Sequence, residues 1–332
     1  RTSAGMRDFL EANALPAGSA FRRQDSIDND SPSYVGDVGI GINPKLAARV
    51  READLLLVVG PRLGEMTTSG YTLIGEQPLI HVHPGAEELG RVYRPALPIL
   101  SGMEQFADAV RDLRLEPSWR EWTKAARGDY EVWQRHDPMP GAVDLGDCIA
   151  HLRERVPDAI VTNGAGNFSA WVHRFWRWHD YPSQLAPTSG AMGYGLPAAI
   201  TAKLLAPERT VICFAGDGDF LMSGQELATA VQYELPIVVL VVNNGMYGTI
   251  RMHQERHYPG RVIGTDLVNP DFAAYARAFG AYGATVTETA QFAGALEDAL
   301  GVGTPALIEL RIDPEAINPR TTLSKVREEA LR

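Results

Sequence analysis

Three oxygen-bearing side chains stand directly after two apolar runs in the middle of the chain. Asp217 follows the run Val211–Ala215. Asn243 and Asn244 follow the run Ile237–Val242. Both runs are short and rich in β-branched residues, as buried parallel strands are. Carboxylate and amide oxygens suit Mg²⁺ or Ca²⁺ far better than they suit zinc.

The residues between the two runs predict the helix that connects them. Leu227, Ala230 and Leu235 recur about one helical turn apart. A strand, a helix and a second strand form a βαβ unit, so both strand ends lie on one edge, where such folds bind ligands. The helix is expected to begin near Ser223 with its N-terminus directed at this edge, which favours a phosphate. These residues therefore predict a Mg²⁺–diphosphate site.

The spacing of these residues resembles a known cofactor signature. Gly216-Asp217-Gly218 is followed by the 24 residues Asp219–Val242 and then by Asn243-Asn244. This pairing resembles the motif of thiamine diphosphate enzymes, and the flanking residues FLMSGQELATAVQYELPIVVLVVNN are similar to the acetolactate synthase branch. The alternative interpretation is an ordinary Rossmann-like unit with a glycine turn and an Asn-rich loop. That alternative does not explain why oxygen acceptors follow both strands.

The resemblance implies a site for thiamine diphosphate and Mg²⁺. The metal ligands would be the side chains of Asp217 and Asn244 and the carbonyl of Met246. The residues implied to contact the cofactor are Gly166, Asn167, Gly190, Ala191, Met192, Gly216, Asp217, Gly218, Asp219, Asn244, Met246 and Tyr247. Because an ionised Asp219 cannot donate a hydrogen bond, its backbone N–H is the expected contact with a phosphate.

A second stretch, Thr188–Ile200, resembles the family segment that contacts the aminopyrimidine ring. The resemblance implies that the carbonyl of Gly190 accepts a hydrogen bond from the cofactor's amino group and that Met192 is wedged between its two rings. Proximity of this kind is worth roughly 7–11 kcal/mol in the best cases. The stretch is also typical of a glycine-rich helix start packed on a strand. Acetolactate synthases place a Gln-His pair near Asn167-Phe168, and Phe168 cannot replace a histidine as a donor to phosphate.

The candidate catalytic residue is His253, on the segment after the second turn. In acetolactate synthases this segment carries a tryptophan that sorts acceptor substrates, and the matching position here is His253. His253 and His257 lie one helical turn apart and could donate or accept protons. Two solvated histidines on a surface helix are the equally favoured alternative.

Composition and charge exclude several classes of protein. The 332 residues are enough for about two domains. A net charge of −10 argues against a nucleic-acid surface. The 2 cysteines supply neither a disulfide framework nor metal-ligand spacing. Because no apolar run approaches the roughly 20 residues of a membrane helix and no signal peptide is recognisable, we expect a cytoplasmic protein without membrane association.

The expected architecture is α/β, with two doubly wound parallel-sheet domains. We expect a Rossmann-like middle domain in residues 1–125, a linker in 126–142 and the thiamine diphosphate-binding fold in 143–332. Acetolactate synthases bind FAD in the middle domain. Because the sequence Gly60–Gly64 differs from the arginine-rich sequence of FAD-binding members, FAD is not expected here. His81 and His83 are expected to point to opposite faces of a strand and to form no metal site.

The resemblance implies a thiamine diphosphate- and Mg²⁺-dependent decarboxylase or carboligase acting on 2-oxo acids. The glutamate that activates the cofactor would come from a pyrimidine-binding domain, for which this chain has no counterpart. We therefore expect a fragment or subunit that is inactive alone and works in a homodimer or homotetramer, with that domain supplied by an upstream segment or another subunit. One alternative is a lyase of the same family acting on a 2-hydroxy ketone or a 2-hydroxyacyl-CoA. Another is a non-catalytic cofactor-binding or assembly module.

Overall fold

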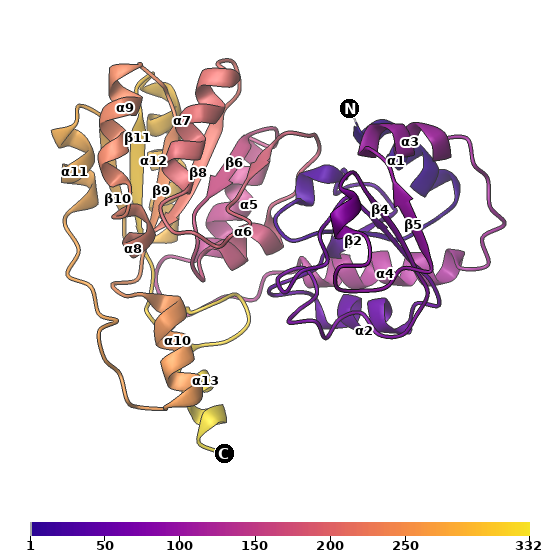
Figure 1. Ribbon diagram of the computed structural model, residues 1–332. Coiled ribbons are helices and arrows are strands. Elements are labelled where there is room, and N and C mark those ends of the chain that lie inside the picture. The colour runs from indigo at the N-terminus through magenta and orange to yellow at the C-terminus, as the bar shows by residue number, and fades with distance from the viewer. Residues whose placement is uncertain (1) are drawn as a thin grey trace. The chain divides into compact units, whose positions relative to one another are not determined.

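The computed structural model describes residues 2–332 and divides into two compact units. Unit 1 comprises Arg1–Arg135 and Arg177–Pro182, and unit 2 comprises His136–Trp176 and Ser183–Arg332. Figure 1 labels the elements of each unit. The division after residue 135 falls within the predicted linker 126–142, whereas the assignment of Arg177–Pro182 to unit 1 was not predicted.

Unit 2 is built on six parallel strands in the order β10-β11-β9-β8-β6-β7. The strands are β6 (Ile160–Asn163), β7 (Gln184–Leu185), β8 (Val211–Gly216), β9 (Val238–Asn243), β10 (Tyr282–Val286) and β11 (Ala306–Arg311). The central strands β8, β9 and β11 are buried along almost their whole length, which explains their continuous apolar runs. The predicted parallel α/β fold is confirmed.

Helices cover both faces of this sheet (Figure 1). The first and third residues of β8, Val211 and Cys213, share one core with the apolar sides of α7, α9 and α11. The opposite face is covered by α5, α6 and α12. The longer helices of unit 2 are α5 (Leu145–Arg155), α6 (Ser169–Phe175), α7 (Gly195–Leu205), α9 (Leu227–Gln232), α10 (Gly248–His257), α11 (Phe272–Ala278), α12 (Phe292–Gly301) and α13 (Leu323–Ala330).

The predicted βαβ unit is present, but the connection between its strands is not one helix. β8 and β9 are neighbours, and the chain between them forms α8 (Asp217–Phe220), the short turn η3 (Gly224–Glu226) and then α9. The expected helix start near Ser223 agrees with the structure, where Ser223 precedes η3 and α9 follows, but the separate short helix α8 was not predicted. Ser223 also donates from Oγ to the carbonyl of Gly193 at 2.7 Å.

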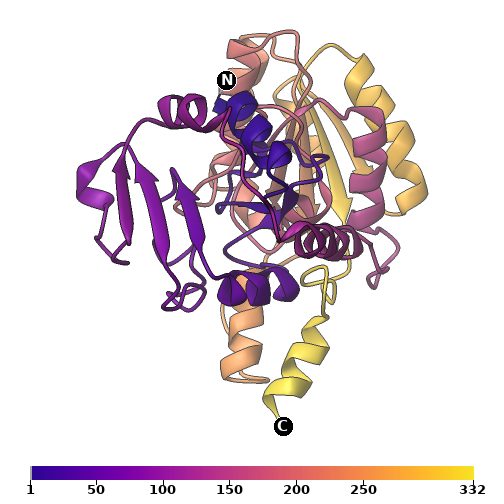
Figure 2. The same ribbon diagram turned by 90° about the vertical axis from the view of Figure 1, so that its right-hand side faces the viewer.

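Unit 1 contains two separate parallel sheets, β1-β2 and β3-β4-β5. Figure 2 shows the strands of the second sheet, in purple, side by side. The strands are β1 (Ala17–Ser19), β2 (Tyr34–Asp37), β3 (Leu56–Val59), β4 (Leu79–His83) and β5 (Leu97–Leu100), with short turns η1 (Gln24–Ser26) and η2 (Ala86–Glu88). The helices are α1 (Thr2–Ala12), α2 (Pro44–Glu52), α3 (Met103–Val110) and α4 (Arg120–Trp133).

Three expectations from the sequence of unit 1 were wrong, namely a loop over Gln24–Val38, a buried strand over Asp54–Gly60, and His81 and His83 on opposite faces of a strand. The segment Gln24–Val38 is not wholly a loop, since it contains β2, a four-residue strand hidden among acidic residues and prolines. β3 is not a fully buried strand, because Leu57 is exposed on the sheet. His81 and His83 stand two residues apart on β4 and therefore share a face, with ring centroids 5.9 Å apart.

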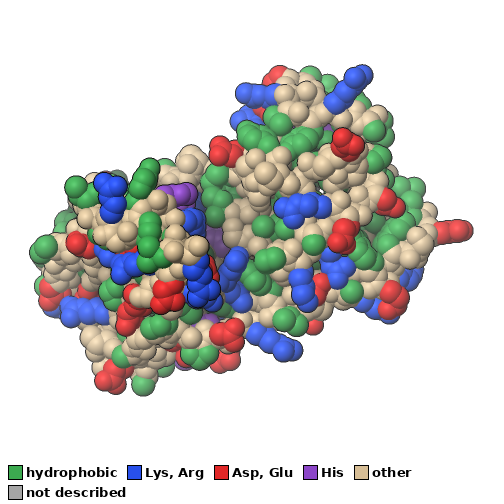
Figure 3. All heavy atoms as spheres, turned by 90° about the horizontal axis from the view of Figure 1, so that it is seen from below, with side chains coloured by type: hydrophobic (Ala, Val, Ile, Leu, Met, Phe, Trp, Pro, Cys, Tyr) green, Lys and Arg blue, Asp and Glu red, His purple; other side chains and the backbone are tan. Residues whose placement is uncertain are grey.

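Among the helices of residues 2–332, none is both long and apolar enough to cross a bilayer. The face drawn in Figure 3 carries lysine and arginine interspersed with aspartate, glutamate and apolar side chains. This mixture accords with a chain whose acidic residues outnumber its basic ones.

Candidate functional site

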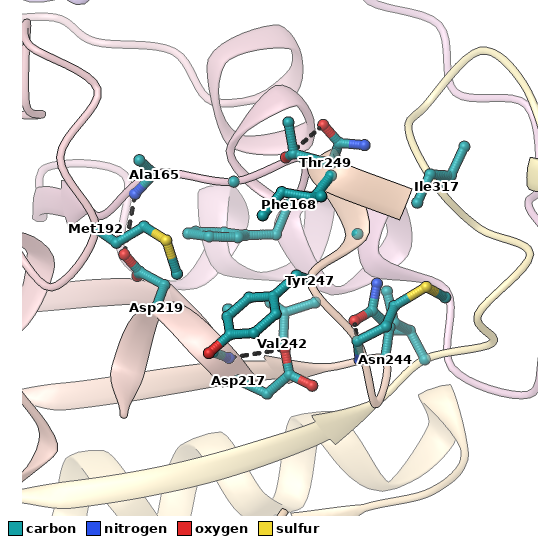
Figure 4. A pocket seen from close by; sticks show the side chains of 18 of the residues that line it. Ala165, Phe168, Met192, Asp217, Asp219, Val242, Asn244, Tyr247, Thr249 and Ile317 are labelled. Carbon is teal, nitrogen blue, oxygen red and sulfur yellow. Dashed lines mark hydrogen bonds between the residues drawn. The ribbon is translucent and has the colours of Figure 1, made fainter. Parts of the chain in front are cut away.

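A cavity of about 230 Å³ lies in unit 2 at the carboxyl edge of the sheet. Its walls come from the turns after β6, β8, β9 and β11 and from the segment before α7. In Figure 4, Met192 and Asp219 lie on one side and Asn244 and Ile317 on the other. The predicted cofactor residues in its lining are Gly166, Asn167, Gly190, Met192, Gly216, Asp217, Gly218, Asp219, Asn244, Met246 and Tyr247. The structure therefore brings together residues from four separate sequence segments.

The three predicted metal ligands lie on adjacent turns of this cavity. Asp217 follows β8, and Asn244 and Met246 follow β9. Asp217 accepts hydrogen bonds from the backbone N–H of Gly218 and of Gly245, each at 2.9 Å. The side-chain oxygen of Asn244 accepts from the N–H of Met246 at 3.2 Å. These bonds fix both side chains and hold the turn after β9 against the turn after β8.

The charge around Asp217 fits a cation. The side chain is buried, and burial raises the pKa of its carboxyl, while hydrogen bonds from Asn269, Gly218 and Gly245 oppose that rise. Among the described residues, these hydrogen-bond donors are all neutral amides. A buried carboxylate held only by neutral donors is stabilised by a nearby positive charge. The oxygen donors of Asp217 and Asn244 are of the kind that Mg²⁺ binds.

The side chain of Asp219 accepts hydrogen bonds from the protein backbone. Its Oδ1 accepts from the N–H of Ala165 at 3.1 Å and from the N–H of Gly193 at 2.8 Å. It therefore ties the turn after β6 and the segment after Met192 to the turn after β8. Gly164 must lack a side chain here, because an added Cβ would lie 2.0 Å from the Asp219 carboxylate. The sequence suggested a role only for the Asp219 backbone, whereas the structure gives its side chain this contact.

Another part of the cavity wall contains the phenyl ring of Phe168 and a hydrogen-bonded pair, Asn167 and Thr249. Phe168 is buried and lines the cavity at the position where acetolactate synthases were expected to carry a histidine. An added Cβ on Gly216 would lie 2.9 Å from this ring, so glycine admits the ring to the cavity. The hydroxyl of Thr249, at the start of α10, donates to Oδ1 of Asn167 at 2.9 Å. This bond directs the Asn167 oxygen toward α10.

Two predicted site residues do not line the cavity. Ala191 lies between Gly190 and Met192 but is not part of the wall. His253 is exposed on α10, where its ring stacks on that of His257 with centroids 6.0 Å apart. Partial burial, followed by the positive charges of Arg256 and His257, lowers the pKa of His253. Its catalytic role stays a prediction.

The structure adds residues that sequence reasoning did not place at the site. Ile312, Ala316 and Ile317 follow β11 and close one end of the cavity. These residues could have been predicted, because the apolar residues of Ala306–Ile312 indicate another parallel strand. The carboxyl end of that strand must meet the same edge as the ends of β8 and β9. Thr249 and Ile250 on α10 also line the cavity, and only the fold of the turn after Asn244 reveals them.

Two family models match the chain. Residues 164–310 match the model described as thiamine pyrophosphate enzyme, C-terminal TPP binding domain, and residues 1–110 match the model described as thiamine pyrophosphate enzyme, central domain. The first match contains the strands and turns that form most of the cavity.

Similar proteins carry the name acetolactate synthase. The chain is 29% identical over 313 residues to acetolactate synthase isozyme 2 large subunit of Escherichia coli, covering 93% of this chain and 57% of that protein. It is 29% identical over 315 residues to acetolactate synthase large subunit of Parasynechococcus marenigrum, covering 92% and 51%. It is 27% identical over 334 residues to the mitochondrial acetolactate synthase of Schizosaccharomyces pombe, covering 92% and 49%.

The chain spans about half the length of the curated relatives it matches. Both of its units correspond to domains of one enzyme family, and the motif that predicted the cofactor lies on the turns of one cavity. The chain therefore belongs to the thiamine diphosphate-dependent enzymes of the acetolactate synthase-like family, of which it carries the central and cofactor-binding domains.

Proposed function

We propose that this chain supplies the Mg²⁺- and diphosphate-binding part of an enzyme that decarboxylates a 2-oxo acid and joins or releases the remaining fragment. The observation that carries the proposal is the meeting of Asp217 and Asn244 at the ends of adjacent parallel strands, in one cavity with Gly190 and Met192. The names of the similar proteins support the acetolactate synthase type of reaction.

The residues of the chain have separable roles in this proposal. Asp217 and Asn244 would hold the cation, which bridges the protein to the diphosphate. Met192 is 36% exposed and enters the cavity beside Phe168, so it is placed to support a folded cofactor (Figure 4). Thiamine diphosphate, when bound, supplies the carbon that attacks the substrate carbonyl, and the protein binds and orients that group.

Removing the metal ligand tests the proposal directly. Asp217→Ala should abolish Mg²⁺-dependent binding of thiamine diphosphate, measured by titration calorimetry at high cofactor concentration. Asp298→Ala is the control, because Asp298 is an exposed carboxylate on α12 outside the cavity. Unchanged cofactor affinity in Asp217→Ala would refute the proposed metal site.

The substrate class needs its own measurement. Combined with a pyrimidine-binding domain, supplied by an upstream segment or another subunit, these two units should convert two molecules of pyruvate into one CO₂ and one 2-hydroxy-2-methyl-3-oxo acid. Product analysis with pyruvate against a 2-hydroxy ketone distinguishes this activity from that of a lyase. Cleavage of the hydroxy ketone without decarboxylation of pyruvate would contradict the proposed substrate.

The same proposal includes the assembly and the cellular compartment of the enzyme. In this proposal the cofactor-activating glutamate comes from a pyrimidine-binding domain, supplied by an upstream segment or another subunit, and the assembly is a homodimer or homotetramer. Both cysteines, Cys148 and Cys213, are free thiols in the structure, which accords with a reducing compartment such as the cytoplasm.

A further inference from the structure

A carboxamide outside the cofactor motif lies against the proposed metal ligand. Nδ2 of Asn269 donates to Oδ2 of Asp217 at 2.8 Å and to Oδ1 of Asn243 at 2.9 Å. Asn269 is 52 residues from Asp217 and 26 from Asn243. It therefore joins the ends of β8 and β9 from a third part of the chain.

The segment after α10 holds Asn269 in this place by backbone pairing. The N–H of Tyr247 donates to the carbonyl of Thr265 at 2.9 Å, and the N–H of Leu267 donates to the carbonyl of Gly245 at 2.8 Å. These bonds flank an antiparallel bridge between Met246 and Asp266. The turn that carries the proposed metal ligands and the segment that carries Asn269 are thus fixed to each other.

The orientation of the Asn269 amide follows from its partners. Both neighbouring atoms, on Asp217 and Asn243, are acceptors, so only the NH₂ end of the amide can face them. The other end, Oδ1, is buried and accepts no hydrogen bond within the described part of the chain. A buried acceptor without a partner costs stability. The two donated bonds offset that cost at this position.

The bonds to Asp217 leave room for one more ligand. A carboxylate offers about four lone-pair sites. Gly218 N–H uses one site on Oδ1, while Gly245 N–H and Asn269 use two on Oδ2. The remaining site lies on Oδ1. The three donors fix the rotation of the carboxylate, and Asp217 lines the cavity.

The second partner of Asn269 is itself anchored in the sheet. Nδ2 of Asn243 donates to Oε1 of Glu309 at 2.7 Å, and the hydroxyl of Thr285 donates to Oε2 of the same glutamate at 3.0 Å. Glu309 is buried, and Arg311 contacts both of its oxygens at 3.1 and 3.2 Å. A continuous set of hydrogen bonds therefore runs from Asp217 across β9 and β11 to β10.

We propose that Asn269 is a positioning residue for the metal, which orients the Asp217 carboxylate by donating to it and to Asn243 together. This inference rests on the proposed function, in which Asp217 binds Mg²⁺. Partners that orient a metal ligand from behind typically contribute 10–100-fold to metal affinity. Asn269 therefore belongs to the metal site, although it touches neither metal nor cofactor.

The test is the affinity for Mn²⁺ in the presence of thiamine diphosphate, read from the paramagnetic resonance signal of free Mn²⁺. Asn269→Leu keeps the branching at Cγ and removes both donated bonds, so its affinity should fall roughly 10-fold or more. Asn269→Ala also removes both donated bonds without adding volume, and its affinity should fall by a similar factor. This second variant also decides the matter if the leucine variant fails to fold.

Asp271→Ala is the matched control, because Asp271 lies two residues away and caps α11 by accepting from the N–H of Ala274 at 2.8 Å. Loss of this cap lowers stability but leaves Asp217 untouched, so Mn²⁺ affinity should not change. Equal Mn²⁺ affinity in wild type and the folded Asn269 variants would overturn the role of Asn269 alone. Failure of the wild-type chain to bind Mn²⁺ with thiamine diphosphate would overturn the proposed function itself.

Discussion

At the residue scale, the two aspartates of the turn after β8 have different partners. Asp217 accepts from amides on its own turn and the next, and it lines the cavity. Asp219 accepts from Ala165 and Gly193, which belong to two other segments of the wall. One carboxylate is therefore available to a cation, whereas the other holds the cavity in shape.

Replacing Asp219 separates these roles. Asp219→Ala leaves the N–H groups of Ala165 and Gly193 without their acceptor, so the free energy of unfolding should fall by about 1–3 kcal/mol. Asp219→Asn keeps a side-chain oxygen at the same place and should lose less. Denaturant unfolding measures the stability, and hydrogen exchange at Gly193 measures the local opening. Equal exchange at Gly193 in wild type and Asp219→Ala would show that this contact does not hold the segment.

The residues of the site divide by how far sequence could predict them. Asp217 and Asn244 were predictable, because each follows an apolar strand and parallel strands end on one edge. The side-chain contacts of Asp219 and Asn269 were not, since they depend on segments 26 to 54 residues away. The sequence predicts that Asn269-Pro270-Asp271 caps a helix, and Asp271 does cap α11, but nothing in that pattern predicts the bonds of Asn269 to Asp217 and Asn243.

At the element scale, α10 and α13 form a pair that borders the cavity. They extend beneath the sheet of unit 2 (Figures 1 and 2), and α10 begins with the cavity residues Thr249 and Ile250. Glu255 on α10 is fully buried and accepts from Arg327 on α13, from Arg251 and from the N–H of Gly260. This carboxylate fastens α13 to α10.

Neutralising Glu255 should loosen this pair. Glu255→Gln retains the size of the side chain but removes the charge opposite Arg327, so the free energy of unfolding should fall by about 1.5–3 kcal/mol. Limited proteolysis should cut α13 sooner than in wild type. The control is Glu297→Gln, since Glu297 pairs with Arg155 on the surface and such pairs contribute little. Equal effects of the two substitutions would contradict a fastening role for Glu255.

Acidification should remove the contribution that the Glu255 carboxylate makes to the free energy of unfolding. The hydrogen bond from Arg327 is the main cause that lowers the pKa of Glu255 to about 2 from its usual 4.5. Because the folded pKa lies below the unfolded one, the stabilisation is complete above about pH 4.5 and is lost as pH falls toward 2. The stability difference between wild type and Glu255→Gln should therefore be constant near neutrality and shrink over this range. Unfolding curves at several pH values measure it, and a difference that grows on acidification would refute the assignment.

The elements that sequence predicted best were those with continuous patterns. Both ends of β8 and both ends of β9 lie within one residue of the predicted runs. The prediction is this close because a strand that is buried on both faces must be apolar throughout. β2 was missed, since Tyr34–Asp37 is short and its burial depends on pairing with β1. The short helix α8 was missed as well, because Leu227 and Ala230, whose spacing predicted the connecting helix, both lie beyond it in α9.

At the scale of the whole molecule, the cavity is small for the cofactor of its family. Its volume of about 230 Å³ is below the roughly 300–1,000 Å³ of sites that enclose a drug-sized ligand. In the proposed function the turns after β8 and β9 hold a metal and a diphosphate, and Gly190 and Met192, which line the same cavity, provide one side for a ring. The cavity therefore fits one part of thiamine diphosphate better than the whole.

The isolated chain should accordingly bind the diphosphate without gaining much from the rest of the cofactor. In the presence of Mg²⁺, thiamine diphosphate and inorganic diphosphate should bind within about a factor of ten of each other, or ~1.4 kcal/mol. The physical reason is that a pyrimidine ring with protein on one side loses little contact with water. Competition between the two ligands in titration calorimetry measures the difference, with Asp217→Ala as the control that binds neither. Thiamine diphosphate binding 1,000-fold tighter, or release of CO₂ from pyruvate by this chain alone, would mean that these two units already form a complete site.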